Sequence, residues 1–230
     1  MKAFPAVCVD NFYKDPDKIR EFALGLDYYS PDPAIYPGKR TKLLDEIEPD
    51  FFKDYCDKFL SLYYDFRYHK ASWKIATAFQ LIQPDDIVDP LKNLGWIHQD
   101  DNCLFASIIY LNPEPDPTTG TSLYKLKNKL HYNIATDTIR KTSQAKLHFY
   151  KDKVDKNYDE SITKLYSLFD ETVRYDNIYN RFISFDGTQY HSANNLYKGS
   201  EARLTQVTFV YEMETDGNWP IKRMQEINDL

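Results

Sequence analysis

Three residues of this chain have the types and the spacing that a mononuclear metal site requires. His98 and Asp100 stand two residues apart in the segment 96–100, and His191 follows much later, just after the Asp186-Gly187 turn. In an extended chain, residues i and i+2 point to the same side, so His98 and Asp100 can bind one ion from a single strand. Two imidazoles and one carboxylate on one face leave other coordination positions open for further ligands.

A second pair of candidates lies on the next predicted strand after His191. Arg203 and Thr205 share one face of that strand, which continues to Phe209. A guanidinium suits bidentate capture of a carboxylate, and a neighbouring hydroxyl adds a donor. An inward-pointing Arg in an apolar strand is costly without an anionic partner. That partner can be a ligand, although an ion pair with Glu201 or Glu212 is the simpler alternative.

The elements that must position these residues begin with helices. Asp15 and Pro16 are typical of a helix start, and residues 19–26 place apolar side chains at helical spacing. A second helix is expected at roughly 47–66, with aromatic side chains every four residues on a core-facing stripe. The proline-rich segment 28–40 between them is expected to be a loop.

From residue 72 onward the pattern changes to short strands. We expect strands at 4–9, 73–82, 105–111, 121–126, 181–185, 189–193 and 204–213. Residues from about 127 to 180 form a polar, Tyr-rich insertion, with a helix expected within 161–173. This order is typical of an antiparallel sandwich or jelly roll with helices against one face. We expect one domain over residues 1–230, with helical support from 1–71 and a β core from 72–213.

Composition excludes several other classes of protein. The chain has 230 residues, a net charge of −6 and only 7 Gly, and it lacks a glycine-rich phosphate loop. The acidic balance argues against a general nucleic-acid binder. The three cysteines are scattered, which favours neither disulfides nor a zinc site. The longest apolar run, nine residues, is too short to span a bilayer, which needs about 20. A soluble cytoplasmic protein without a membrane partner is therefore expected.

The ordered set of motifs resembles the Fe(II)/2-oxoglutarate-dependent dioxygenases, in particular their prolyl-4-hydroxylase-like branch. The matching motifs, within residues 72–213, are His98-x-Asp100, Tyr110-Leu111-Asn112, Gly120-Thr121, His191 and Arg203-x-Thr205. The resemblance implies a double-stranded β-helix with Fe(II) held by His98, Asp100 and His191. It also implies that 2-oxoglutarate is bound through its distal carboxylate by Arg203, with Thr205 and Tyr110 assisting, and that no catalytic residue is needed beyond the metal ligands.

The implied activity is hydroxylation of an unactivated C–H bond with O₂, releasing succinate and CO₂. Asp100 argues against a halogenase, since related halogenases lack this carboxylate. Two alternatives stay open: a catalytically inactive jelly-roll binding or structural module, and a zinc hydrolase using the same three ligands. The substrate is expected to be a small molecule or a protein side chain rather than nucleic acid, with Arg40 and Trp96 as candidate contacts. The insertion and the loop 36–41 are the segments expected to set specificity.

Overall fold

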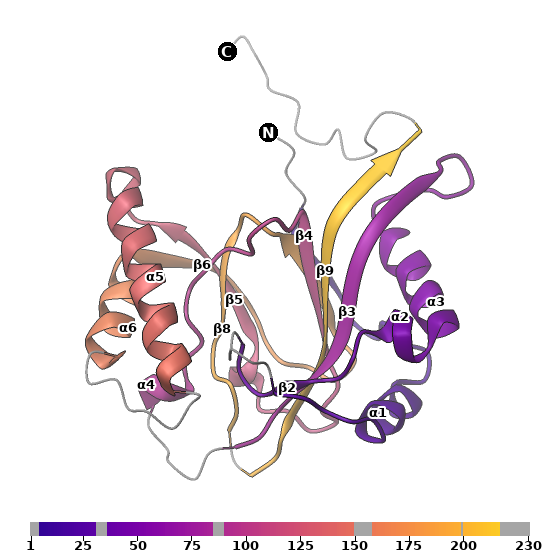
Figure 1. Cartoon of the computed structure of the whole chain (residues 1–230), viewed down its shortest axis with the longest axis horizontal. Helices are drawn as coiled ribbons and strands as arrows, with labels where there is room; N and C mark the ends of the chain where they lie inside the picture. Colours follow the sequence, from indigo (N-terminus) through magenta and orange to yellow (C-terminus); the bar gives the residue numbers. More distant parts are fainter. Residues whose placement is uncertain (1–4, 31–35, 85–89, 150–157, 199, 217–230) are drawn as a thin grey trace.

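Two antiparallel β-sheets stack on each other, with helices on both outer sides (Figure 1). The computed structural model describes residues 5–30, 36–84, 90–149, 158–198 and 200–216. The six-stranded sheet, here the major sheet, has the order β1 (Val7–Val9), β7 (Phe182–Asp186), β4 (Phe105–Tyr110), β9 (Arg203–Thr215), β3 (Ala71–Ile82) and β2 (Lys39–Arg40). The three-stranded minor sheet has the order β6 (Phe169–Tyr175), β5 (Thr121–Leu126) and β8 (Tyr190–Ala193). The mainly β fold expected from the sequence is confirmed.

Successive side chains along a strand of the major sheet point to opposite faces and pack in two different hydrophobic cores. In β4, Phe105 and Ile109 pack under the N-terminal helices, whereas Ala106 and Tyr110 pack in the space between the two sheets. This period-two alternation is the one that a strand buried on both faces requires. Residues at odd positions from 203 to 209 of β9 therefore face the interior between the sheets.

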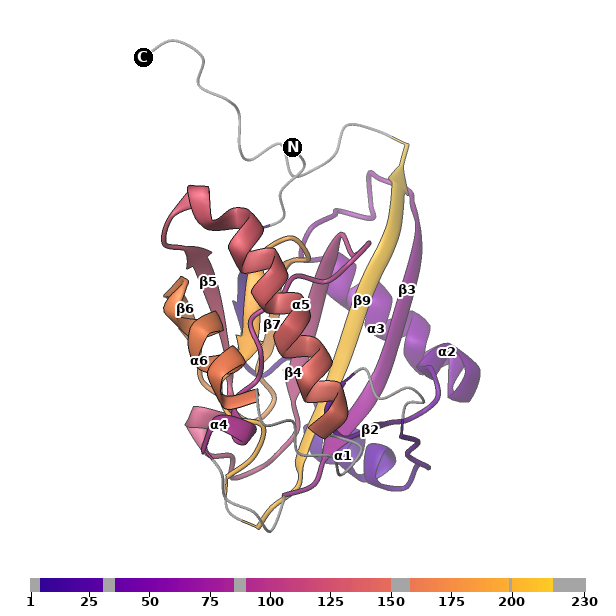
Figure 2. The same ribbon diagram turned by 60° about the vertical axis from the view of Figure 1, so that its left-hand side comes forward.

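The N-terminal helices cover the outer face of the major sheet (Figures 1 and 2). The first, α1 (Pro16–Leu24), begins as expected, because the Asp15 carboxylate accepts a hydrogen bond from the Lys18 N–H and Pro16 occupies the first turn. The helix expected at roughly 47–66 is shorter than predicted: α3 covers Pro49–Leu60, residues 61–66 are not helical, and a separate short helix, α2 (Leu44–Ile47), precedes it. Pro49 restricts Glu48 to a non-helical backbone, so the chain restarts its helix there.

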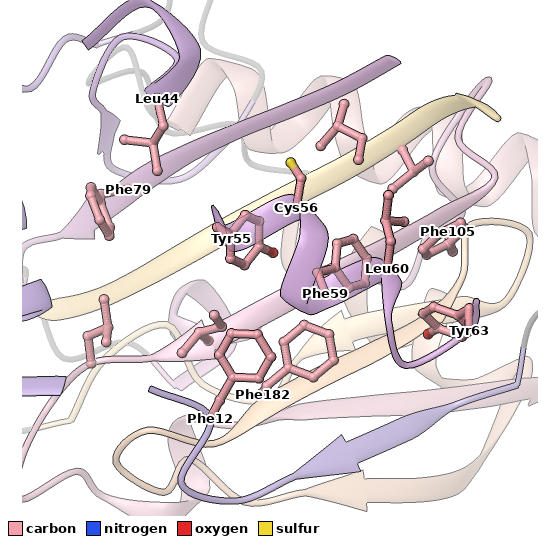
Figure 3. Close-up of a cluster of buried hydrophobic side chains, with 14 of the residues drawn as sticks. Phe12, Leu44, Tyr55, Cys56, Phe59, Leu60, Tyr63, Phe79, Phe105 and Phe182 are labelled. Carbon is pink, nitrogen blue, oxygen red and sulfur yellow. The ribbon is translucent and has the colours of Figure 1, made fainter. Parts of the chain in front are cut away.

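The aromatic stripe of α3 forms the centre of the largest hydrophobic core (Figure 3). Phe59 is fully buried, and its ring contacts those of Tyr55, Tyr63, Phe105 and Phe182. The Tyr55 hydroxyl also hydrogen-bonds the hydroxyls of Ser107 (2.9 Å) and Thr208 (2.6 Å), one on each central strand. These contacts fix α3 across β4 and β9, as the stripe predicts.

A second helical layer covers the outer face of the minor sheet (Figures 1 and 2). It consists of α4 (Pro90–Asn93), α5 (Tyr132–Phe149) and α6 (Tyr158–Ser167), while η1 (Pro117–Thr119) and η2 (Lys129–His131) are short 3₁₀ turns. The helix expected within 161–173 ends at Ser167, and residues 169–175 instead form β6. Pairing with β5 explains the difference, because a long-range partner overrides a local helical pattern.

Within the described ranges, no helix is long and apolar enough to cross a membrane.

Replacing Phe59 by Ala should lower the free energy of unfolding by about 3–5 kcal/mol, since the cavity it leaves lies among rigid aromatic rings. Denaturant titration measures this change. Tyr68, which is 76% exposed, is the control, and Tyr68→Ala should change stability by about 0.5 kcal/mol or less. Equal effects of the two substitutions would contradict the central role assigned to the stripe of α3.

Candidate metal and cosubstrate site

The structure brings His98, Asp100 and His191 together at one end of the space between the sheets. His98 lies outside the named strands but pairs with His191 in an isolated antiparallel bridge next to β8. The His98 N–H donates to the His191 carbonyl (3.0 Å) and the His191 N–H donates to the His98 carbonyl (2.9 Å). The two imidazole rings consequently lie side by side, with their centroids 4.4 Å apart.

The geometry of the three side chains suits one metal ion. Asp100 Oδ1 lies 3.8 Å from His98 Nε2, and Asp100 Oδ2 lies 3.6 Å from His191 Nε2. Two ligand atoms that each bind an ion at about 2.1 Å must lie within about 4.2 Å of each other. Both His–Asp pairs meet this requirement, and the ligand atoms of all three residues lie within 4.8 Å of one another, so a small adjustment closes the set around an ion.

Hydrogen bonds to the backbone set the tautomers of both imidazoles. Nδ1 of His98 lies 2.8 Å from the Trp96 carbonyl, and Nδ1 of His191 lies 2.9 Å from the Gln189 carbonyl. Because a carbonyl only accepts, each Nδ1 must carry the proton, which leaves the lone pair of each Nε2 directed at Asp100. Burial, assisted by His191, lowers the pKa of His98, so this imidazole is neutral and available as a ligand at pH 7.

Asp100 itself carries a buried acceptor that the protein leaves unsatisfied. Its Oδ2 has no hydrogen-bond partner within the described part of the chain. A buried carboxylate oxygen without a donor is costly, and a cation between it and the two imidazoles removes that cost. The residues present therefore fit a divalent metal.

Two glycines allow the strands that carry the ligands to approach closely. A Cβ on Gly95 would lie 2.6 Å from the Ala193 carbonyl oxygen, and one on Gly187 would lie 2.2 Å from the Cys103 carbonyl oxygen. Gly95 precedes the segment that carries His98, and the Gly187 carbonyl accepts a hydrogen bond from the Asp100 N–H (2.9 Å). Only glycine fits either position.

The insertion contributes a residue that the sequence analysis missed. The Tyr166 hydroxyl, from α6, donates to the Gly95 carbonyl (2.9 Å) and hydrogen-bonds the Ser192 hydroxyl (3.1 Å). Gly95 lies three residues before His98, and Ser192 directly follows His191. Tyr166 therefore links the two ligand-bearing segments from the outer face of the minor sheet. A close-approach glycine just before the His98 motif is the sequence signal that could have indicated this tight packing.

Arg203 lies on the inner face of β9 without a counter-charge. Its side chain is 7% exposed, and its Nε and Nη2 have no hydrogen-bond partner in the described ranges. The alternative ion pairs with Glu201 and Glu212 are absent there, since Glu201 pairs with Arg20 and Glu212 with Lys74. Burial lowers the pKa of Arg203, which is the cost of a cation held in a cavity without an anion.

The other cosubstrate candidates lie beside Arg203. Tyr110 and Thr205 are fully buried partners across β4 and β9, and the Arg203 guanidinium lies 5.7 Å from the centroid of the Tyr110 ring. The Tyr110 hydroxyl donates to the Thr121 hydroxyl (2.9 Å) on the opposite sheet. The three residues predicted to bind 2-oxoglutarate thus form one cluster between the sheets.

The two candidate substrate contacts occupy different places. Arg40, on the edge strand β2, lines a cavity of about 220 Å³ on the inner face of β3 and β9. Trp96 lies with its ring 5.2 Å from that of His98 and packs against the core under α5 and α6. Trp96 is not among the residues that line this cavity.

Comparison with known proteins identifies a family and solved structures that share the fold. Residues 2–205 match a family described as "Family of unknown function (DUF6445)". No curated protein matches the chain.

Several solved structures resemble this one. HygX from Streptomyces hygroscopicus, with nickel and 2-oxoglutarate bound, is 10% identical at a TM-score of 0.54, over 89% of this chain and 82% of its own. An oxidoreductase of the 2OG-Fe(II) oxygenase family from Burkholderia pseudomallei is 10% identical at a TM-score of 0.51, over 89% and 83%. A Pseudomonas putida prolyl-4-hydroxylase is 12% identical at a TM-score of 0.46, over 89% and 91%. The first two likenesses confirm the expected double-stranded β-helix fold.

Replacing Gly95 by Ala should weaken metal binding by about tenfold to a hundredfold, because the added Cβ pushes the His98 segment away from β8. Calorimetric titration of metal-free protein with Ni²⁺ measures this affinity. Gly25 is the matched control, since a Cβ there meets its nearest neighbour at 3.5 Å, an ordinary contact. Wild-type affinity in Gly95→Ala would show that this close approach does not position His98.

Proposed function

We propose that this chain, which belongs to the DUF6445 family of unknown function, is an Fe(II)- and 2-oxoglutarate-dependent oxygenase that hydroxylates an unactivated C–H bond. One observation carries the proposal. The interior between the sheets holds a carboxylate oxygen of Asp100, and the Nε and Nη2 of Arg203, that have no hydrogen-bond partner in the described part of the chain. A metal ion satisfies the first and an organic acid satisfies the second, and 2-oxoglutarate is an acid that binds both a metal and an Arg.

Each residue has a defined part in this proposal. His98, Asp100 and His191 hold Fe(II) and leave positions open for other ligands. Arg203 binds the distal carboxylate of 2-oxoglutarate as a bidentate fork, while Tyr110 and Thr205 shape the surrounding wall. The bound metal and cosubstrate supply the oxidising chemistry with O₂, giving succinate and CO₂. The protein supplies ligands, orientation and a cavity shielded from water. The nickel and 2-oxoglutarate in HygX, which shares this fold, support the same ligands here.

The alternative functions account for less of the site. A zinc hydrolase would use the three ligands, but it would give no role to the buried charge of Arg203. The metal-ligand group also contains no Glu to act as a general base. An inactive binding module would leave both Asp100 and Arg203 unsatisfied. We propose a small molecule or a protein side chain as the substrate, because the net charge of −6 disfavours nucleic acid. We also propose that the protein is cytoplasmic.

Anaerobic addition of Fe(II) and 2-oxoglutarate to metal-free protein should produce the visible charge-transfer band of a metal-bound 2-oxo acid. His98→Ala should abolish the band, because it removes a ligand. Arg203→Met should raise the 2-oxoglutarate concentration for half-saturation by about tenfold or more, because a charge-assisted contact is lost. Absorption spectroscopy during titration measures both effects.

Matched variants outside the site control for loss of charge and of imidazole. His131→Ala and Arg67→Met, the latter 79% exposed, should behave like the wild type. A folded wild type that gives no band would contradict the oxygenase proposal. If such protein were found to contain zinc, the hydrolase would become the better account.

A further inference from the structure

The cavity beside β2 has walls that suit an apolar molecule. Three aromatic side chains line it, those of Tyr36, Phe209 and Tyr211, together with the aliphatic side chains of Leu43 and Val207. Its volume of about 220 Å³ is small, which favours a compact molecule or a single side chain over a larger surface. Pockets of this kind bind through apolar contact and take their specificity from a few polar groups.

Among the described residues that line the cavity, Arg40 is the one that carries a charge. Its guanidinium lies 3.8 Å from the centroid of the Tyr36 ring and 5.3 Å from that of Phe209. Two of its nitrogens, Nε and Nη2, donate to the same oxygen of Gln80, at 3.3 and 3.2 Å. The Gln80 amide is itself held by donation to the Pro37 carbonyl (2.6 Å), which keeps its oxygen toward Arg40.

This cation has no anionic partner in the described part of the chain. One shared amide oxygen occupies few of the donors of a guanidinium, which has five N–H groups in a planar fork. Burial lowers the pKa of Arg40 to about 10, and the opposing influences come from Tyr36, Asp100 and Tyr211. Arg40 is therefore a partly buried cation with free donors, a combination that favours binding of an anion.

The cavity also lies close to the candidate metal ligands. Leu104, four residues after Asp100, donates its N–H to the carbonyl of Val210 (2.7 Å), which lies between the lining residues Phe209 and Tyr211. The Asp100 carboxylate also acts electrostatically on Arg40 and Tyr211. A molecule in the cavity can thus place its apolar body near the metal while its charged end contacts Arg40. Arg203, the residue proposed to bind 2-oxoglutarate, is not among the lining residues.

We infer that the substrate is a small monocarboxylate with an apolar body, and that Arg40 binds its carboxylate in this cavity. This inference rests on the proposed function. The charge balance argues for a single negative charge, because the described residues that line the cavity offer one cation and no anion. The Tyr36 and Phe209 rings hold the guanidinium plane, so the fork is oriented before the ligand arrives. Arg40 then determines specificity rather than taking part in the chemistry.

The test uses 4-methylpentanoate as the probe and its uncharged isostere 4-methylpentanamide as the reference. Calorimetric titrations are made on protein loaded with Ni²⁺ and 2-oxoglutarate, so that no turnover intervenes. The wild type should bind the acid at least about tenfold more tightly than the amide. Arg40→Met should lose this preference, with a 2-oxoglutarate affinity within about threefold of the wild type. Lys39→Met, which removes an exposed charge from the neighbouring position of β2, should keep the preference.

The outcomes separate this inference from the proposed function. A wild type that binds no 2-oxoglutarate would overturn the proposed function, and the substrate role of Arg40 with it. If the wild type bound 2-oxoglutarate but did not distinguish acid from amide, only the present inference would fail. The inference would also fail if Arg40→Met weakened the binding of 2-oxoglutarate as strongly as Arg203→Met does, since Arg40 would then belong to the cosubstrate site. Tighter binding of 4-methylpentyl phosphate than of the acid would overturn the assignment of a carboxylate.

Discussion

The pair of backbone hydrogen bonds between His98 and His191 is the constraint on which the site depends. It joins two segments that are far apart in the sequence and sets their imidazoles side by side. With the backbones paired, the Nδ1 atoms reach nearby carbonyls, and both Nε2 atoms face Asp100. The ligand geometry therefore follows from this backbone pairing between the segment of His98 and β8.

The surrounding layers hold this pairing in place from outside. The Tyr166 hydroxyl hydrogen-bonds the Gly95 carbonyl and the Ser192 hydroxyl, in the segments that carry His98 and His191. Its ring packs with the helices of the insertion against the minor sheet. On the opposite side, α3 fixes β4 and β9 through aromatic packing and the Tyr55 hydroxyl. The insertion thus acts on the ligand-bearing segments through packing on the outer face of the minor sheet.

The interior between the sheets combines charges of both signs that the protein does not neutralise by itself. Asp100, Arg203 and Arg40 each retain unpaired polar atoms or unused donors in a buried or partly buried position. Such groups cost stability, and the hydrophobic clusters on the two outer faces offset that cost. Here the uncompensated charges gather in the interior between the sheets, while elsewhere the local sequence preferences agree with the fold. This pattern is typical of a protein whose ligands complete the charge balance.

The sequence alone determined what depends on local geometry. The i, i+2 spacing of His98 and Asp100 places both on one side of any extended chain, and Asp15-Pro16 before apolar residues at helical spacing predicts the start of a helix. Most strands and the core-facing stripe of α3 also followed from local periodicity. The edge strand β2, by contrast, lies in the segment 28–40 that was expected to be a loop, and the helix start at Pro49 was readable but missed. Only the tertiary structure decided the pairing of residues 169–175 with β5, the contacts of Tyr166 and the cavity around Arg40. Each of these depends on which distant segments pair, and no short-range pattern encodes that choice, because many pairings satisfy the same alternation of apolar and polar residues.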